Sequence, residues 1–137
     1  MSQENVEIVR RMFEAFRNRD WTTALEPVHP DEIEMDVTRS PIEGLNGVYK
    51  GREELAFFWG LWLEAWGEQE IEEPELIDAG DQVLFWVTSH KFRGRASGVT
   101  VDFPAYAWLV TVRDGKIVRA TIYMDKGEAR EAAVLPE

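Results

Sequence analysis

The chain has 137 residues, of which 45% are hydrophobic and 30% are charged, a composition typical of one globular domain that buries a core. Its formal net charge of -11 disfavours binding to nucleic acid or to an anionic membrane surface. It contains no cysteine, which excludes disulfide bonds, thiol catalysis and thiolate metal sites. We expect a cytoplasmic protein, because the N-terminal segment lacks the apolar stretch of a signal peptide and no apolar segment is long enough to span a bilayer.

Two helices are predicted in the N-terminal part of the chain. The first should run from the N-terminus to Arg19, with Ser2 or Asn5 as its N-cap. Its apolar residues recur at helical spacing and are Val6, Val9, Met12, Phe13 and Phe16. Asp20 is expected to cap a second, short helix over Trp21 to Glu26.

The next segments alternate between strand, loop and helix. The alternation of apolar and acidic residues over Glu32 to Val37 predicts a half-buried strand. Arg39 to Lys50 is predicted to be a loop, because it is rich in proline, glycine and asparagine. The strongest helix is predicted over Gly51 to Trp66, and Phe57 and Leu61 suggest that it is buried on more than one side. Its aromatic and apolar stripe consists of Leu55, Phe58, Trp59, Trp62, Leu63 and Trp66.

From residue 70 onward the pattern is that of strands. Four are predicted, over residues 70–78, 82–92, 99–113 and 116–125, and a short helix is predicted from Lys126 to Glu131. The pair Asp114-Gly115 is the strongest hairpin signal, because it accepts the positive φ angles of a type I′ turn. Helices that precede an antiparallel meander indicate the α+β class.

The two faces of the last hairpin predict a homodimer. A two-residue turn sets Val112 opposite Ile117 and Tyr106 opposite Tyr123, with Asp125 at the end of the same face. One face is then apolar, and the other is aromatic and amphipathic, so neither resembles a fully solvated face. Because the helices can cover only one face, we expect the other to contact a partner subunit, while a monomer with exposed tyrosine and tryptophan remains the alternative.

The order of these elements and several local sequences resemble the SnoaL-like branch of the nuclear transport factor 2-like superfamily. The sequences are EIVRRMFEAFRNRDW, HPDEIEMD, GVYKGREELAFFW, LIDAGDQVLF, RGRASG and VRDGKIVRATIYMD. The resemblance implies one cone-shaped domain over residues 1–137, with three helices packed on a strongly bent, mainly antiparallel sheet and a pocket between them. The family includes isomerases, cyclases, epoxide hydrolases, dehydratases and binding proteins, so the resemblance leaves the reaction open.

The resemblance can be tested against Δ5-3-ketosteroid isomerase. Asp36 falls near the position of that enzyme's general base, but Met12 and Ala107 stand where it has its two oxyanion donors. Without those donors a dienolate would not be stabilised, and such stabilisation is usually the largest contribution to catalysis. We therefore exclude ketosteroid isomerisation by that mechanism.

Four polar residues are candidates for acid–base chemistry. Asp125 matches loosely the position of the acid–base aspartate of SnoaL-type cyclases, and Asp36, Arg39 and Asp125 together resemble the Asp–Arg–Asp group of limonene-epoxide-hydrolase-like members. Alternation directs Asp36 outward unless the strand bends or ends there. His90, which shares a predicted strand face with Leu84, is either a proton shuttle or a structural histidine.

The pocket wall should combine helix and strand residues. Met12 and Phe16 of the first helix and Trp59 and Trp62 of the third are the expected apolar contacts, and Tyr123 is a polar one. The ligand should be small, neutral or cationic, and largely apolar, because the negative surface potential repels anions.

No cofactor is expected, whether metal, nucleotide or flavin. Neither His29 nor His90 has a second histidine or carboxylate at metal-ligand spacing, and nucleotide-binding glycine motifs are absent from the sequence. Three functions remain open. They are a cofactor-independent acid–base enzyme (isomerase, cyclase, lyase or hydrolase), a ligand-binding domain without catalysis, and an interaction domain that uses the fold as a scaffold.

Overall fold

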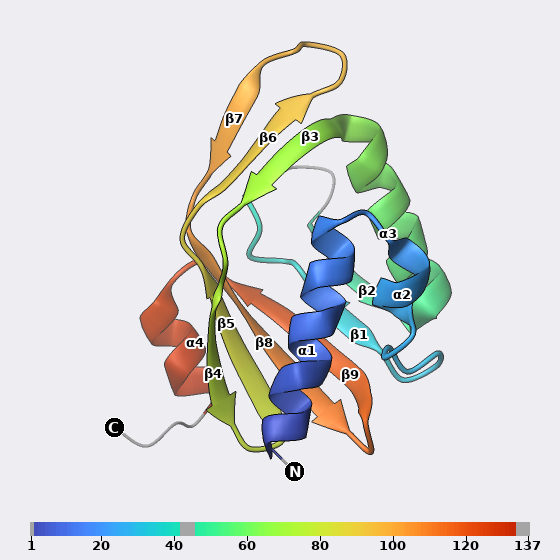
Figure 1. The fold of residues 1–137 in the computed structure, drawn as a ribbon, viewed down its shortest axis with the longest axis vertical. Helices are drawn as coiled ribbons and strands as arrows, with labels where there is room; N and C mark the ends of the chain where they lie inside the picture. The colour runs from blue at the N-terminus through green and yellow to red at the C-terminus, as the bar shows by residue number, and fades with distance from the viewer. Residues whose placement is uncertain (1, 42–45, 134–137) are drawn as a thin grey trace.

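The structure is a computed structural model that describes residues 2–41 and 46–133. Within these residues it shows helices packed on both sides of a curved sheet (Figure 1). The elements in chain order are α1 (Ser2–Arg17), α2 (Trp21–Leu25), β1 (Glu34–Asp36), β2 (Val48–Lys50), α3 (Gly51–Ala65), β3 (Trp66–Ile71), β4 (Glu75–Ala79), β5 (Gln82–Val87), β6 (His90–Gly94), β7 (Thr100–Phe103), β8 (Tyr106–Arg113), β9 (Lys116–Tyr123) and α4 (Lys126–Ala132).

The strands form two connected sheets. The larger has the order β2-β1-β9-β8-β5-β4, and the smaller has the order β3-β6-β7. Neighbouring strands are antiparallel, except that β1 pairs with β9 in parallel. Helices α1, α2 and α3 lie on one side of the larger sheet, and α4 lies on the other (Figure 1). The predicted α+β fold with a bent, mainly antiparallel sheet is confirmed.

Three of the four strands predicted from residue 70 onward are interrupted, and at each interruption the chain passes from one sheet to the other. The strand predicted over residues 70–78 is divided at residues 72–74, the one over 82–92 at Thr88 and Ser89, and the one over 99–113 at Pro104 and Ala105. Pro104 has no N–H to donate to a ladder, so an end of pairing there has a direct cause. The prediction of continuous strands was therefore wrong at these three places.

The helix predictions hold with smaller corrections. Asp20 caps α2, because its Oδ1 accepts a hydrogen bond from the backbone N–H of Thr23 at 3.2 Å, as predicted. Phe57 of α3 is 64% exposed, contrary to the predicted burial, whereas Leu61 is half-buried. The segment predicted as a loop over 39–50 contains strand β2, and its residues 42–45 lie outside the described part of the chain. The side chains of Ser2, Leu63 and Trp66, to which a cap and stripe positions were assigned, are not described.

The last hairpin has the predicted turn but a different register. Asp114 and Gly115 have φ angles of 52° and 75°, as a type I′ turn requires. Val112 pairs with Ile117 as predicted, but Thr111 then pairs with Arg119, which leaves Val118 as the extra residue of a β-bulge. Beyond the bulge every pair is shifted by one residue from the prediction.

The bulge changes which side chains of the hairpin share a face. Trp108 now pairs with Ile122, and Val110 pairs with Ala120, all on the side of α1 and α3. Leu109 pairs with Thr121 on the opposite side. The predicted division into one apolar and one aromatic face was therefore wrong, because it assumed a ladder without a bulge.

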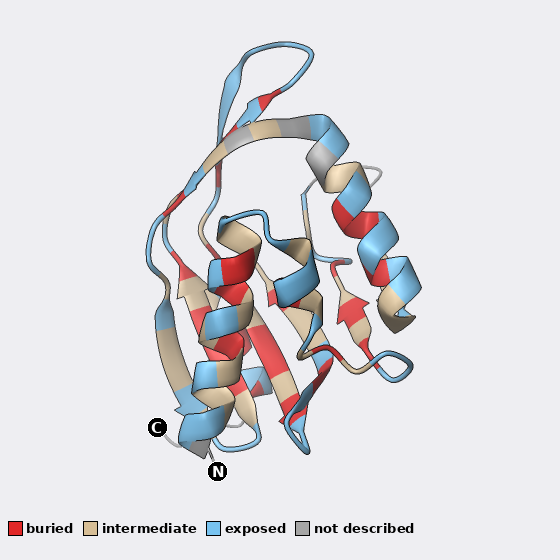
Figure 2. Ribbon diagram, turned by 45° about the vertical axis from the view of Figure 1, so that its right-hand side comes forward, coloured by how far each residue is buried: buried red, intermediate tan, exposed pale blue. Residues whose placement is uncertain are grey.

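The outer face of the sheet is partly covered within the chain itself. Leu84, Ala107 and Leu109 are buried there in contact with Ala129 and Ala133 at the C-terminal helix. Figure 2 shows the buried residues on the sheet and on the inward sides of the helices, whereas the loop between β6 and β7 is exposed. Helix α4 therefore covers part of the face that the sequence analysis assigned to a partner subunit.

Candidate functional site

A cavity lies between the inner face of the sheet and helices α1 and α3. Its volume is about 120 Å³, and we refer to it as the inner cavity. Its wall is composed mainly of apolar and aromatic side chains, as is typical of small-molecule sites. The lining residues are Met12, Phe13, Phe16, Val28, Ile33, Met35, Val37, Ser40, Leu55, Phe58, Trp59, Trp62, Phe85, His90, Phe103, Tyr106, Trp108, Val110, Ile117, Ala120 and Ile122.

The periodicity of helices and strands explains why most of these side chains point into the cavity. On α3, Leu55, Phe58 and Trp62 are spaced by three or four residues and therefore share one face of the helix. On β8, Trp108 and Val110 are spaced by two and point to the same side of the sheet. The cavity thus forms where an aromatic helix face meets an apolar sheet face.

The aromatic rings of the wall pack closely against one another. The ring of Trp59 lies 5.7 Å from that of Phe16 and 5.1 Å from that of Trp21, measured between centroids. The rings of Trp62 and Phe92 lie 5.3 Å apart in an edge-to-face arrangement. These distances fall within the favourable range for aromatic pairs, so much of the aromatic content serves packing as well as the cavity.

The polar part of the wall is centred on a hydrogen bond between His90 and Tyr106. His90 Nδ1 lies 2.9 Å from Tyr106 Oη, and His90 Nε2 lies 3.3 Å from Gln69 Oε1. An amide oxygen only accepts, so the ring proton of a neutral His90 lies on Nε2. Nδ1 is then an acceptor, and the hydroxyl group of Tyr106 donates to it.

Both members of this pair are uncharged at neutral pH. His90 is 3% exposed, and burial lowers its pKa to about 4. Burial also raises the pKa of Tyr106 well above its usual value. The inner cavity therefore presents neutral hydrogen-bonding groups to a ligand, and neither imidazolium nor phenolate.

Five of the predicted site residues line the inner cavity. They are Met12, Phe16, Trp59, Trp62 and His90. The remaining four, Asp36, Arg39, Tyr123 and Asp125, are not among its lining residues. The structure thus brings together the predicted apolar contacts and His90, and it leaves the predicted carboxylates outside.

Asp36, Arg39 and Tyr123 form a separate cluster. Asp36 Oδ1 accepts hydrogen bonds from the backbone N–H and the hydroxyl group of Thr38 at 3.0 and 2.6 Å, and its Oδ2 lies 4.0 Å from an Arg39 guanidinium nitrogen. Partial burial raises the pKa of Asp36, but the bonds with Thr38 and the charge of Arg39 outweigh it, so the pKa lies below its usual value. The Arg39 guanidinium lies 4.5 Å from the centre of the Tyr123 ring. A carboxylate with a lowered pKa is a weak base, and these contacts are those of a structural residue.

Asp125 has a structural role at the start of α4. Its Oδ2 accepts a hydrogen bond from the backbone N–H of Glu128 at 3.1 Å, which makes it the N-cap. Among the described residues, no hydrogen bond or ion pair connects Asp125 to the cluster of Asp36 and Arg39. An Asp–Arg–Asp group is therefore not assembled at the inner cavity.

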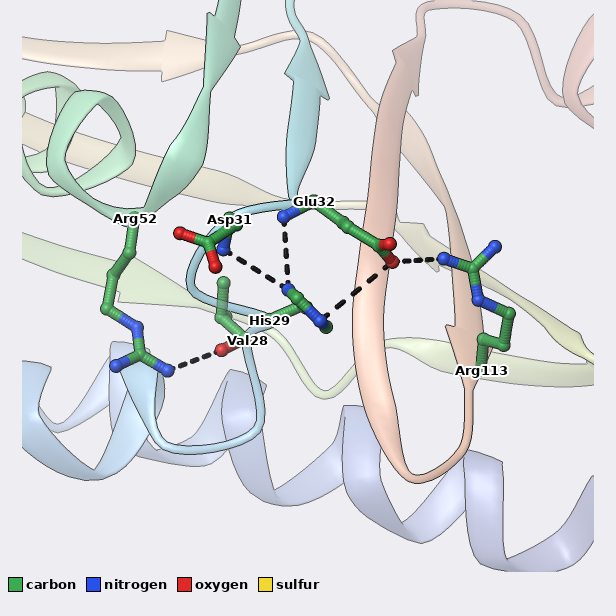
Figure 3. A network of polar contacts seen from close by, with 6 residues as sticks. All are labelled: Val28, His29, Asp31, Glu32, Arg52 and Arg113. Carbon is green, nitrogen blue, oxygen red and sulfur yellow. Dashed lines mark hydrogen bonds and ion pairs between the residues drawn. The ribbon is translucent and has the colours of Figure 1, made fainter.

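His29 is held in a surface network near the start of β1. Its Nδ1 accepts hydrogen bonds from the backbone N–H groups of Asp31 and Glu32 at 3.2 and 3.0 Å (Figure 3). The carboxylate of Glu32 lies 3.9 Å from His29 Nε2 and also pairs with Arg113. The network ties the turn before β1 to β8, so His29 organises the backbone.

Tyr106, Ser40 and Gln69 are the polar residues that the sequence analysis missed. Tyr106 was placed on one hairpin face with Trp108 and Tyr123. It does share a side with Trp108, but the bulge at Val118 moves Tyr123 to the opposite side. Ala107, which was aligned with an oxyanion donor of ketosteroid isomerase, is buried on the outer face, whereas its neighbour Tyr106 lines the cavity. The sequence signal that would have found Tyr106 is its spacing of two from Trp108, which gives both side chains the same side of the strand.

Two further properties concern the residues that the structure describes. They contain no group of three or more His, Cys, Asp or Glu side chains arranged to hold a metal ion. No helix among residues 2–41 and 46–133 is long and apolar enough to cross a membrane.

The fold and the inner cavity define a nuclear transport factor 2-like protein, in which a bent sheet and helices enclose a small pocket. The family model described as "SnoaL-like domain" matches residues 9–120, so the chain belongs to the SnoaL-like domain family. This confirms the resemblance found in the sequence. A comparison with functionally curated proteins gave no match.

Solved structures with the same fold cover nearly the whole chain. An NTF2-like protein from Burkholderia xenovorans is 27% identical, covers 97% of this chain and 98% of its own, and has a TM-score of 0.76. A putative SnoaL-like polyketide cyclase from Mesorhizobium loti is 25% identical over 85% of this chain and 96% of its own, with a TM-score of 0.60. TerC, crystallised with polyporic acid, is 23% identical over 96% of this chain and 99% of its own, with a TM-score of 0.73.

Proposed function

We propose that the protein binds a small, neutral, largely apolar molecule in the inner cavity. The observation that supports this is the lining itself: none of the lining residues carries an ionised side chain at neutral pH, and most are apolar or aromatic. A charged ligand would be desolvated there without a partner, whereas an apolar ligand gains by leaving water. A cavity without a carboxylate favours binding over the carboxylate-based catalysis considered from the sequence.

A titration that follows tryptophan fluorescence tests this function. Trp59, Trp62 and Trp108 line the cavity, so a bound ligand such as toluene should change their emission. Ala120→Leu fills part of the cavity and should abolish the change, while Thr121→Leu, on the outer face of the same strand, should keep it. Equal responses of these two variants, or no response of the unmodified protein to any small apolar molecule, would refute the proposal.

A second candidate function is cofactor-independent acid–base catalysis at the same site. The 2.9 Å contact between His90 and Tyr106 favours it, because a proton can move along such a hydrogen bond while a bound substrate is isomerised, cyclised or cleaved. The relative named as a putative polyketide cyclase makes cyclisable polyketides a reasonable first panel of substrates. Turnover that falls about 100-fold in Tyr106→Phe but persists in Asp36→Asn would support it.

The homodimer remains a proposal as well. Ile77, Trp86 and Tyr123 are half-buried on the outer face, beside the part that the C-terminal helix covers. A second copy placed on this face would bury them further.

A further inference from the structure

The volume of the inner cavity limits the ligand to about one ring. Dry apolar cavities of about 150 Å³ bind benzene in proteins, so a cavity of about 120 Å³ admits a ligand of similar size. A fused three- or four-ring molecule exceeds this volume. The packed aromatic wall also resists expansion, because large buried rings rearrange only at a cost.

The direction of the hydrogen bonds determines what Tyr106 offers to that ligand. The amide oxygen of Gln69 faces His90 Nε2, so His90 accepts at Nδ1 and the single hydroxyl proton of Tyr106 is used in that bond. The phenolic oxygen of Tyr106 retains its capacity to accept. A ligand that meets this oxygen must therefore bring its own O–H or N–H.

We propose that the inner cavity selects a neutral, single-ring ligand whose hydroxyl or amine donates a hydrogen bond to Tyr106 Oη, and that Gln69 is the positioning residue that makes Tyr106 an acceptor. This inference rests on the proposed binding function. It adds a polar requirement to that function, since most of the remaining wall is apolar or aromatic. Phenols and anilines are the simplest members of the class.

A comparison of ligands of equal size tests the polar requirement. Phenol and toluene differ in one group, and benzaldehyde and benzoate provide an acceptor and a charge. Calorimetric titration of the full chain should give phenol about fivefold tighter binding than toluene, the factor that about 1 kcal/mol represents. Benzaldehyde should not exceed toluene, and benzoate should not bind. In Tyr106→Phe, phenol and toluene should bind equally.

The outcomes distinguish a failure of the donor requirement from a failure of the proposed binding function. If toluene binds and phenol gains nothing, the binding function stands and the donor requirement is wrong. If benzaldehyde binds more tightly than phenol, Tyr106 donates to the ligand and the inference is again wrong. If none of the neutral probes binds, both proposals fail.

The role of Gln69 has a spectroscopic readout that does not depend on ligand binding. Nitrogen-15 chemical shifts of the His90 ring distinguish a proton on Nε2 from one on Nδ1. The intact protein should show the Nε2–H form, and Gln69→Leu, which removes the acceptor, should shift the ring toward the Nδ1–H form. An Nδ1–H ring in the intact protein would overturn the proposal.

Discussion

Acidification should destabilise the protein through His90. In the folded state burial lowers the pKa of His90 to about 4, whereas a histidine in the unfolded chain titrates near its ordinary value of about 6.5. Between these values the unfolded chain binds a proton that the folded protein does not, so the free energy of unfolding falls as the pH falls. The contribution is fully present above about pH 6.5 and is lost by about pH 4.

The size of the effect follows from the two pKa values. The whole shift corresponds to about 3 kcal/mol, and about 2 kcal/mol of it should be lost between about pH 7 and pH 5. Urea denaturation followed by tryptophan fluorescence at several pH values measures this loss. His90→Gln should remove this part of the slope, because the variant has no imidazole to protonate.

Two comparisons make the result decisive. The carboxylates titrate in both proteins, so the difference between the intact protein and His90→Gln isolates the histidine. His29→Gln keeps His90 and is a matched control, and it should retain the slope that His90 causes. Equal slopes in the intact protein and His90→Gln would show that His90 is not held neutral by burial.

Three further predictions concern residues outside the inner cavity. Asp125→Ala should lower the free energy of unfolding in urea by about 1 kcal/mol, because it removes the N-cap of α4, and it should leave toluene affinity unchanged. Asp36→Asn should also leave toluene affinity unchanged in the fluorescence titration, since Asp36 does not line the cavity. Light scattering should give twice the chain mass of 15.8 kDa if the outer face pairs, and Trp86→Glu should then give a monomer. A monomer mass for the unmodified protein would reject the dimer.

Local signals in the sequence were sufficient where one residue decides the conformation. Asp20 has the short acceptor side chain that caps a helix, and it caps α2. Asp114 and Gly115 tolerate positive φ and form the last turn. The side of α3 that contains Trp59 and Trp62 was identified by helical spacing, and both residues line the cavity. Each of these features depends on contacts within a few residues of the chain.

Features that depend on distant contacts were not predictable in the same way. Strand β2 lies within a segment rich in turn residues and exists because Val48, Tyr49 and Lys50 pair with β1. The bulge at Val118 cannot be recognised from the alternation of residues in β9, because the registers with and without the bulge both place apolar residues on each face. Periodicity alone therefore assigns the hairpin faces one residue away from their observed positions.

The position of His90 in the inner cavity depends on a break in the predicted strand, whereas that of Tyr106 follows the regular alternation of β8. His90 is the first residue of β6 after the break at Thr88 and Ser89, and Tyr106 is the first residue of β8 after the break at Pro104 and Ala105. In an unbroken strand His90 would share a face with Leu84, which is buried on the outer side of the sheet. The break changes the phase of the alternation, and His90 turns toward the cavity instead. Tyr106 needs no such change, because it lies two residues before Trp108 on β8 and shares its side of the sheet. The inward position of His90 thus arises from backbone irregularity, which periodicity in the sequence does not reveal.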